Sequence, residues 1–292
     1  MDAITNYHVI DPTNVGDLLS APANYFSFPG YTLERADIRV AKAEDARDKH
    51  LILGGGGLLF PRFLDNIAQL LAGSDSGGKQ RPKIIAWGVG QQIYGQDKCE
   101  NQSFDYSQYL EKFDLIGIRD FSSPHDWVPC ASCMHPAFDK QREIQHEFVV
   151  FSHKKFQLAI DQFPRMTNEV QNFEEVLDFL GSGETVLTSS YHGAYWATLL
   201  GRKVLAFPFS SKFYTFKHRP GIYPVKNWSQ PAIRLSLFNK VIYQFKYGNK
   251  FSCQTYDWQA ALKNCTAYPE SLSENRSQNQ QYYVRVLDLL NS

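Results

Sequence analysis

Residues 184–209, ETVLTSSYHGAYWATLLGRKVLAFPF, combine a strand, a tight turn, a helix and a second strand. The two ends are short apolar runs of strand length, and residues 192–201 between them have helical spacing. Such an order predicts a parallel βαβ unit, whose crossover is right-handed in nearly all proteins. His192 lies at the turn where the helix begins, a place where a core helix seldom needs a histidine. The stretch therefore predicts a parallel sheet and marks His192 as a candidate functional residue.

The same alternation of strands and helices runs through the rest of the chain. Strand-like runs occur at residues 7–10, 50–53, 83–87, 113–120 and 147–152. Four glycines, at residues 54–57, follow the second run and lead us to expect a turn into a helix. This rhythm is typical of doubly wound parallel sheets. We expect two Rossmann-like α/β domains, residues 1–145 and 146–292, facing each other across a cleft.

The C-terminal region is harder to interpret. Residues 281–290 have the pattern of a closing helix, and the polar stretch 269–280 before them predicts a mobile connection. Residues 212–228 mix Lys, Arg and aromatic side chains. Such a segment could lie against a membrane surface, cover the cleft as a substrate loop, or form an ordered surface loop.

Composition excludes several classes of function. The 292 residues contain 30 Lys and Arg against 30 Asp and Glu, so no global charge favours nucleic acid. The N-terminus lacks the basic head and apolar core of a signal peptide, and no apolar run approaches the ~20 residues of a membrane span. Five cysteines, an odd number, fit a reducing compartment. We expect a cytoplasmic protein, with peripheral contact at the inner face of the membrane left open.

Ligands of parallel sheets bind beyond the carboxyl ends of the strands. Most of the unusual polar and glycine residues follow predicted strands, so we expect them around one cleft. They are Asn14, Gly16, Asp17, Gly55, Gly56, Gly57, Gly88, Arg119, Ser189, Ser190, Tyr191, His192 and Lys212.

Each part of this set has two interpretations. The glycines could let a phosphate or sugar approach the backbone, or they could form only a tight turn. They match neither G-x-G-x-x-G nor a Walker motif. Arg119 could grip an anion bidentately or pair with Asp120. His192 could donate a proton to an anionic substrate, because a helix N-terminus lowers its pKa and a bound phosphate raises it, or it could cap its own helix.

Other candidate sites are weaker. Cys130 and Cys133 with His135 lack the second ligand pair of a structural zinc site, so we expect no metal. A serine hydrolase is disfavoured because the G-x-S-x-G elbow is missing. The remaining histidines, such as His8 and His153, are expected on the surface or in loops.

The motifs NVGD, LILGGGGLL, WGVGQQ, IGIRDFSS, HPAF and TSSYHGAYWATLLGRKVLAFP follow one another over residues 6–217. Together they resemble the polysaccharide pyruvyl transferases. The resemblance implies a GT-B-like fold and transfer of pyruvate from phosphoenolpyruvate to two hydroxyls of a glycan sugar, forming a ketal. The acceptor would be a polysaccharide or its lipid-linked precursor. The only donor needed is phosphoenolpyruvate, without a metal or other cofactor.

The resemblance also implies roles for residues on the donor side. His192 matches the family's active-site histidine, proposed as a general acid, and Arg119 matches an arginine thought to contact phosphoenolpyruvate. Many members carry Arg two residues before the histidine, where this chain has Ser190. Lys212 could replace that charge, or the donor could differ.

On the acceptor side, Asn14, Gly16 and Asp17 match the family's N-terminal motif, and Asp17 is the candidate base. Two alternatives stay open. One is a GT-B glycosyltransferase that uses a nucleotide sugar, whose diphosphate would suit the same helix N-terminus. The other is a non-catalytic, glycan-binding relative.

Overall fold

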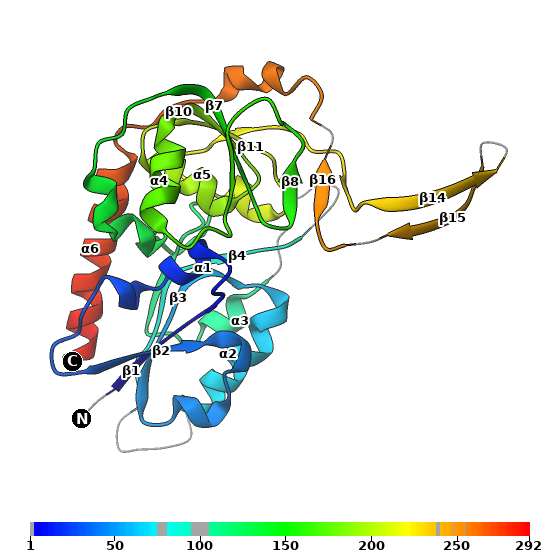
Figure 1. Ribbon diagram of the computed structural model, residues 1–292. Helices are drawn as coiled ribbons and strands as arrows, with labels where there is room; N and C mark the ends of the chain where they lie inside the picture. The colour runs from blue at the N-terminus through cyan, green and yellow to red at the C-terminus, as the bar shows by residue number, and fades with distance from the viewer. Residues whose placement is uncertain (1–2, 75–80, 95–104, 238–239, 247, 254) are drawn as a thin grey trace.

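Two parallel β-sheets organise the computed structural model of the chain, which describes residues 3–74, 81–94, 105–237, 240–246, 248–253 and 255–292 (Figure 1). The first sheet has six strands in the order β2-β1-β3-β4-β5-β6, and the second has five in the order β12-β11-β10-β7-β9. All their ladders are parallel. The predicted mixed α/β class with parallel sheets is confirmed.

The first sheet occupies the N-terminal half of the chain, and its central strands β1, β3 and β4 are buried as expected for a parallel sheet covered on both faces. Its strands are β1 (Ala3–His8), β2 (Thr32–Asp37), β3 (Lys49–Leu59), β4 (Ile84–Gln91), β5 (Leu115–Ile118) and β6 (Asp126–Trp127). Its helices are α1 (Val15–Leu19), α2 (Pro61–Ser74) and α3 (Ser107–Leu110). Pro61 is tolerated because it begins α2, where its missing N–H has no helical partner.

The second sheet contains the predicted βαβ unit. Its strands are β7 (His146–Ser152), β9 (Arg165–Thr167), β10 (Gly183–Thr188), β11 (Lys203–Ala206) and β12 (Gly221–Ile222), with helices α4 (Phe173–Ser182) and α5 (Tyr191–Leu199). β10 and β11 pair in parallel, with Val186 opposite Val204, so the strand–helix–strand prediction is confirmed. Every residue of α5 is buried.

Two smaller sheets follow from the C-terminal half. β8 (Phe156–Leu158), β13 (Trp228–Ser229) and β16 (Phe251–Cys253) form a three-stranded sheet. β14 (Ala232–Leu237) and β15 (Lys240–Lys246) pair antiparallel as a hairpin that extends away from the rest of the chain (Figure 1).

The last helix, α6 (Ser271–Leu290), corrects one prediction. The stretch expected as a mobile connection is helical from Ser271 onward. The prediction failed because the buried face of α6 carries asparagines, at 275 and 279, which hydropathy assigns to the surface. Asn279 accepts a hydrogen bond from the indole of Trp87 at 2.9 Å, and Asn275 accepts one from the hydroxyl of Tyr195 at 2.9 Å.

α6 joins the two halves of the chain. At its start, the Ser271 hydroxyl donates to the carbonyl of Thr198 at the end of α5. Farther along, Tyr282 donates to the carbonyl of Ala86 in β4, and Tyr282, Val286 and Leu290 belong to a core cluster of the first sheet. The red helix of Figure 1 accordingly runs from one half to the other.

The glycine run corrects a second prediction. No turn follows residue 53, because β3 continues through all four glycines to Leu59. Gly55 and Gly56 have positive φ angles of 88° and 89°, which side chains rarely adopt. A Cβ at Gly55 would lie 2.4 Å from the carbonyl oxygen of Ser20. Likewise Gly88, at φ 63°, lies inside β4 rather than in a turn after it.

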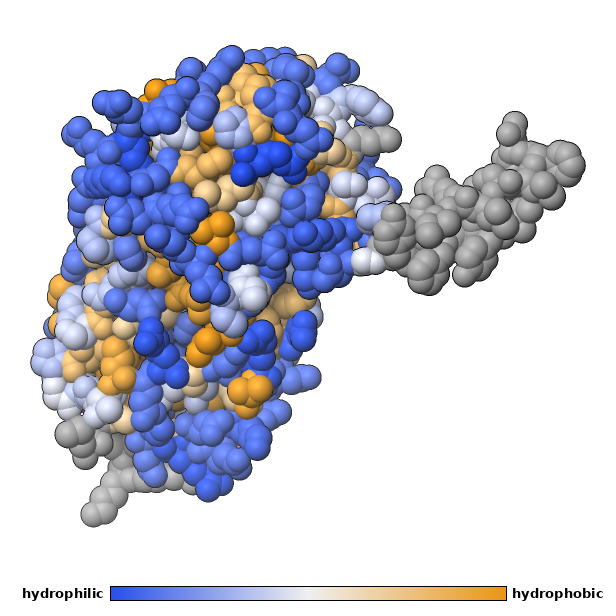
Figure 2. All heavy atoms as spheres, viewed as in Figure 1, coloured by the Kyte–Doolittle hydropathy of each residue, from blue (hydrophilic) through white to orange (hydrophobic). Residues whose placement is uncertain are grey.

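Within the described residues, no helix is long and apolar enough to cross a bilayer. On the face shown in Figure 2, hydrophobic residues appear in small groups among hydrophilic ones.

Candidate active site

The start of α5 meets the start of α1, so the two halves touch at the candidate site. A Cβ at Gly16 would lie 2.1 Å from Nδ1 of His192, which means that the imidazole rests against the α1 backbone. Asn14 caps α1 through its Oδ1, which accepts from the N–H of Gly16 at 3.2 Å. The same Oδ1 accepts from Asn168 of the other half at 2.9 Å. The structure thus places His192 beside the N-terminal motif.

His192 does not cap its own helix. Ser190 does so, because its Oγ accepts from the N–H of Gly193 at 3.2 Å. Ser189 is also committed to the backbone, since its Oγ accepts from the N–H of His153. His192 is 7% exposed, and burial lowers its pKa well below the ordinary value, helped by the nearby positive charge of Arg119. The imidazole is therefore neutral at pH 7 in the free protein.

Arg119 follows the end of β5 and is only 4% exposed. In the part of the chain that the structure describes, its Nε and Nη2 have no hydrogen-bond partner. Its guanidinium lies over the ring of Tyr191, 4.2 Å from the centroid. Asp120 acts on the guanidinium only through its charge, because its carboxylate accepts hydrogen bonds instead from the N–H of Gln91 and the hydroxyl of Thr215, both at 2.6 Å. A buried cation with free donors is costly, so this geometry favours an anionic ligand.

Two glycines make room for that guanidinium. A Cβ at Gly90 would lie 2.3 Å from Nε of Arg119, and one at Gly57 would lie 3.3 Å from its Nη2. Gly55 and Gly88 approach protein backbone instead, namely the carbonyls of Ser20 and of residue 129, and Gly56 is near only Ser20 Oγ at 3.7 Å. Two of the predicted glycines of the first half therefore border the site, Gly16 against His192 and Gly57 against Arg119.

Asp17 and Lys212 bring two titrating groups to the same place. Burial lowers the pKa of Lys212 to about 7, with Arg119 acting in the same direction. Burial raises the pKa of Asp17 to about 6, against the opposing effect of Lys212. Asp17 accepts from Asn14 Nδ2 at 2.7 Å, and Lys212 donates to Gln92 Oε1 at 3.2 Å. Both groups therefore change charge close to neutral pH.

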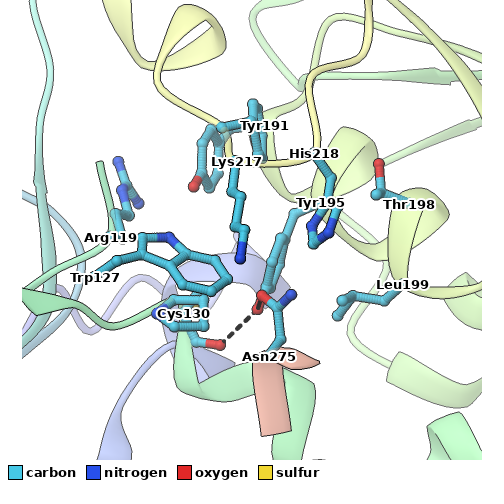
Figure 3. Close-up of a pocket in the computed structure, with 12 residues that line it drawn as sticks. Arg119, Trp127, Cys130, Tyr191, Tyr195, Thr198, Leu199, Lys217, His218 and Asn275 are labelled. Atoms are coloured by element: carbon cyan, nitrogen blue, oxygen red, sulfur yellow. Dashed lines mark hydrogen bonds between the residues drawn. The ribbon is translucent and has the colours of Figure 1, made fainter. Parts of the chain in front are cut away.

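A small cavity of ≈20 Å³ lies beside Arg119 (Figure 3). That volume holds about one water molecule. The cavity is bounded by residues of both halves and of α6: Arg119, Trp127, Pro129, Cys130, Tyr191, Tyr195, Thr198, Leu199, Phe216, Lys217, His218 and Asn275. His192 does not line it, but Cys130 and Tyr191 connect the two places. At the other end, Lys217 forms an ion pair with Glu274 of α6, and Nε2 of His218 lies 3.0 Å from the same carboxylate.

Sequence reasoning missed two histidines near the site. His8 is not a surface residue: it is 2% exposed in β1, and its Nδ1 lies 3.3 Å from the carbonyl of Asp17. His153 follows β7 and packs against Phe209 at 5.0 Å between centroids, and burial with the charge of Lys212 lowers its pKa to about 3. The position of His8 could have indicated its place: it is the last residue of β1, and residues 14–17 begin at the same edge of the sheet.

The cysteine motif has no metal-like arrangement. Across the described ranges, no group of three or more His, Cys, Asp or Glu side chains could hold a metal ion. Cys130 and Cys133 are both buried free thiols. Cys99 lies outside the described residues.

Comparisons with known proteins add little to this geometry. No family model matches the chain, and no curated protein matches it. Its structure is similar to the crystal structure of a functionally uncharacterized protein from Klebsiella pneumoniae subsp. pneumoniae, at 17% sequence identity and a TM-score of 0.41. The similarity covers 73% of this chain and 86% of that one.

Proposed function

We propose that the chain is a pyruvyl transferase with two Rossmann-like domains in a GT-B-like arrangement. It moves pyruvate from phosphoenolpyruvate to a sugar of a polysaccharide or of its lipid-linked precursor, forming a ketal. The observation that carries the proposal is the buried guanidinium of Arg119, whose Nε and Nη2 are unpartnered among the described residues. Phosphoenolpyruvate has a carboxylate and a phosphate, and both match such a fork.

Donor binding assembles positive charge around the anion. Arg119 provides two parallel N–H donors, and Lys212 adds a second cation whose charged form the donor stabilises. Ser190 stands where many pyruvyl transferases carry Arg, but its hydroxyl caps α5 and so prepares the helix N-terminus. In this assignment Lys212 supplies the charge that Ser190 lacks.

His192 supplies the proton. It is neutral in the free protein, and the charge of the bound donor raises its pKa, so the imidazolium forms when substrate is present. It protonates the methylene carbon of phosphoenolpyruvate and creates an oxocarbenium-like centre at the neighbouring carbon. A sugar hydroxyl adds there and loses its proton to Asp17. Phosphate leaves with its bonding electrons and takes up that proton, and a second hydroxyl closes the ketal and returns its proton to His192.

Asp17 accepts the proton that the attacking hydroxyl loses. With a pKa of about 6 it is ionised at pH 7, yet it is a stronger base than an ordinary carboxylate. Asn14 holds one of its oxygens and leaves the other for substrate. The overall balance is one phosphoenolpyruvate and one diol giving one ketal and one phosphate.

The acceptor must enter by a movement of the chain, because the cavity beside Arg119 holds about one water. The basic and aromatic segment 212–228 covers this place: Phe216 stacks on Tyr191 at 4.5 Å, and Lys217 pairs with Glu274. These contacts favour a cover over the cleft. Peripheral contact of the same segment with a membrane, close to a lipid-linked acceptor, belongs to the proposal as well.

A ligand panel tests the function. Phosphoenolpyruvate at 100 times its Kd should stabilise the protein by about 2.7 kcal/mol, and the shift should vanish in Arg119→Ala. Phosphate release with candidate glycans should follow. Protection by UDP-, GDP- or CMP-sugars without protection by phosphoenolpyruvate would instead identify a glycosyltransferase. Glycan binding with no response to either donor would identify a non-catalytic relative.

A further inference from the structure

Cys130 contacts the ring of His192 but has no part in the chemistry proposed above. Its Sγ lies 3.8 Å from Nε2 of His192 and 3.2 Å from Oγ of Ser132. Cys130 is 1% exposed, and burial raises the pKa of its thiol, so the sulfur carries a hydrogen at neutral pH. A neutral thiol is a weak donor and a weak acceptor, so its direction has to be set by its neighbours.

Trp196 limits the possible directions. Its indole N–H can only donate, and it donates to Oγ of Ser132 at 3.0 Å. Either atom could donate in the contact between Ser132 and Cys130, but the sulfur is the only acceptor among the described residues that the hydroxyl hydrogen of Ser132 reaches, so we take the hydroxyl as the donor. The thiol hydrogen is then free to go to Nε2 of His192, in the tautomer whose Nε2 accepts. Trp196 follows His192 by one helical turn and stacks on it at 5.1 Å, which closes the ring of contacts.

The direction of the chain decides the tautomer of His192. In a neutral imidazole one nitrogen accepts and the other carries the hydrogen. Because Nε2 accepts from Cys130, the hydrogen is on Nδ1, which is the nitrogen facing Gly16. Nδ1–H therefore points toward the α1 motif with Asn14 and Asp17.

We propose that Cys130 is a positioning residue for His192: its thiol, held by Ser132 and Trp196, fixes the ring and makes Nδ1 the nitrogen that meets substrate. A second observation points to a ligand beside Cys130, because Cys130 and the unpartnered Arg119 line the same cavity. The inference rests on the proposed function only in taking His192 as the working residue.

A thiol suits both charge states of the imidazole. When His192 is protonated, Nε2–H must donate, and the sulfur can accept it while the thiol hydrogen turns to the free lone pair of Ser132. A hydroxyl in the same position can make the same reversal. A methyl group can make neither contact, so Cys130→Ser should preserve the arrangement and Cys130→Ala should abolish it.

The test is ¹⁵N NMR of the His192 imidazole in the full chain without ligand. We expect the Nδ1–H tautomer in the wild type and in Cys130→Ser, and a mixture of tautomers in Cys130→Ala. Cys133→Ala is the matched control, since that thiol is equally buried but accepts from Asn279 and has no contact with His192. It should leave the tautomer unchanged.

Turnover gives the second measurement. Cys130→Ala should lower kcat by about 10-fold or more with the KM for phosphoenolpyruvate unchanged, because an imidazolium that has lost its contact with the sulfur no longer holds Nδ1–H toward the substrate. Cys130→Ser should keep most of the wild-type kcat.

An Nε2–H tautomer in the wild type, or an unchanged tautomer in Cys130→Ala, would overturn the inference. If Cys130→Ala fails to fold, Ser132→Ala decides, because loss of the orienting hydroxyl should also mix the tautomers. The NMR measurement needs no pyruvyl transfer. A wild-type protein with the Nδ1–H form but no response to phosphoenolpyruvate would refute the function and not the role of Cys130.

Discussion

The glycine run of β3 and the start of α5 look alike in the sequence, because each follows a buried strand and precedes a helix. In the structure they differ. Residues 54–57 continue the strand, and Gly55 presses against the carbonyl of Ser20. At α5 the strand does end, Ser190 caps the helix and His192 faces the other half of the chain. A glycine in the sequence indicates that another group lies close to the backbone at that position. It does not indicate whether that group belongs to a ligand or to the protein itself.

Gly90 and Gly57 have a third role, different from that of Gly55 and from that of His192. They leave space for the guanidinium of Arg119, so they serve the site through a side chain rather than by contact with a ligand. The comparison therefore separates three roles: shaping the fold at Gly55, making room at Gly90, and direct chemistry at His192. Substitutions at these places should separate in the same way.

The largest effect is expected at His192. His192→Asn keeps a polar group but cannot transfer a proton, so turnover of phosphoenolpyruvate should fall about 100-fold or more. Binding of phosphoenolpyruvate, followed by calorimetry, should persist. Phosphate release at near wild-type rate would make His192 a binding residue and would move the acid elsewhere.

Arg119 and Gly90 should give the next effect. Arg119→Lys keeps the charge and loses the fork, so the Kd for phosphoenolpyruvate should rise by about 10- to 150-fold, the equivalent of roughly 1.5–3 kcal/mol for one charge-assisted hydrogen bond. Gly90→Ala should weaken binding in the same direction, because the added Cβ displaces the guanidinium. Arg285→Lys, in an exposed pair with Asp126, is the control. Unchanged affinity in Arg119→Lys and Arg119→Ala would leave Arg119 a structural residue.

Gly55→Ala should affect folding and not binding. The positive φ alone costs about 1–3 kcal/mol for a residue with a side chain, and the contact with Ser20 adds to it. Denaturant unfolding should show the lower stability, while the folded fraction should bind phosphoenolpyruvate as before. Normal stability with lost binding would mean that the glycine run touches the ligand, and the comparison above would fail.

The smallest effect concerns pH. Burial raises the pKa of Asp17 from 3.8 to about 6, so its contribution to stability is complete below 3.8 and is lost as the pH rises through about 6. The pKa of Lys212 is lowered from 10.5 to about 7, so its contribution is present above 10.5 and is lost as the pH falls through about 7. Lys212→Met removes the charge that lowers the pKa of Asp17. The acid limb of the pH–rate profile should move upward, whereas a downward or absent shift would show that the two groups do not interact.

The sequence predicted the parts of the fold that depend on local periodicity. The unit over residues 184–209 was identified because two short apolar strands and the helix between them leave a pattern within one short window. The tight packing of Ser20 on Gly55 could not be seen, because the two residues are 35 positions apart and meet only in the folded chain.

Buried polar groups account for most of the other failures. Asn275 and Asn279 were assigned to a loop because their partners, Tyr195 and Trp87, lie far away in the sequence. His8 was assigned to the surface or a loop because it is polar, whereas it is buried in β1 beside the carbonyl of Asp17. At the site, the residue types were visible in the sequence. The hydrogen bonds that Asp120 makes in place of one to Arg119, and the contact of Cys130 with His192, form only in the folded chain.

Helix α6 has a consequence for how the chain is made. Tyr282, Val286 and Leu290 of α6 pack against Trp87 and the apolar face of the first sheet. They follow the last strand of that sheet, β6, by roughly 160 residues. At a ribosomal rate of about 5–20 residues per second, this apolar face stays uncovered for roughly 8–30 seconds. The N-terminal half therefore leaves the ribosome first, but its apolar face is covered only when α6 has been made. A nascent chain halted before α6 should bind chaperones through that face.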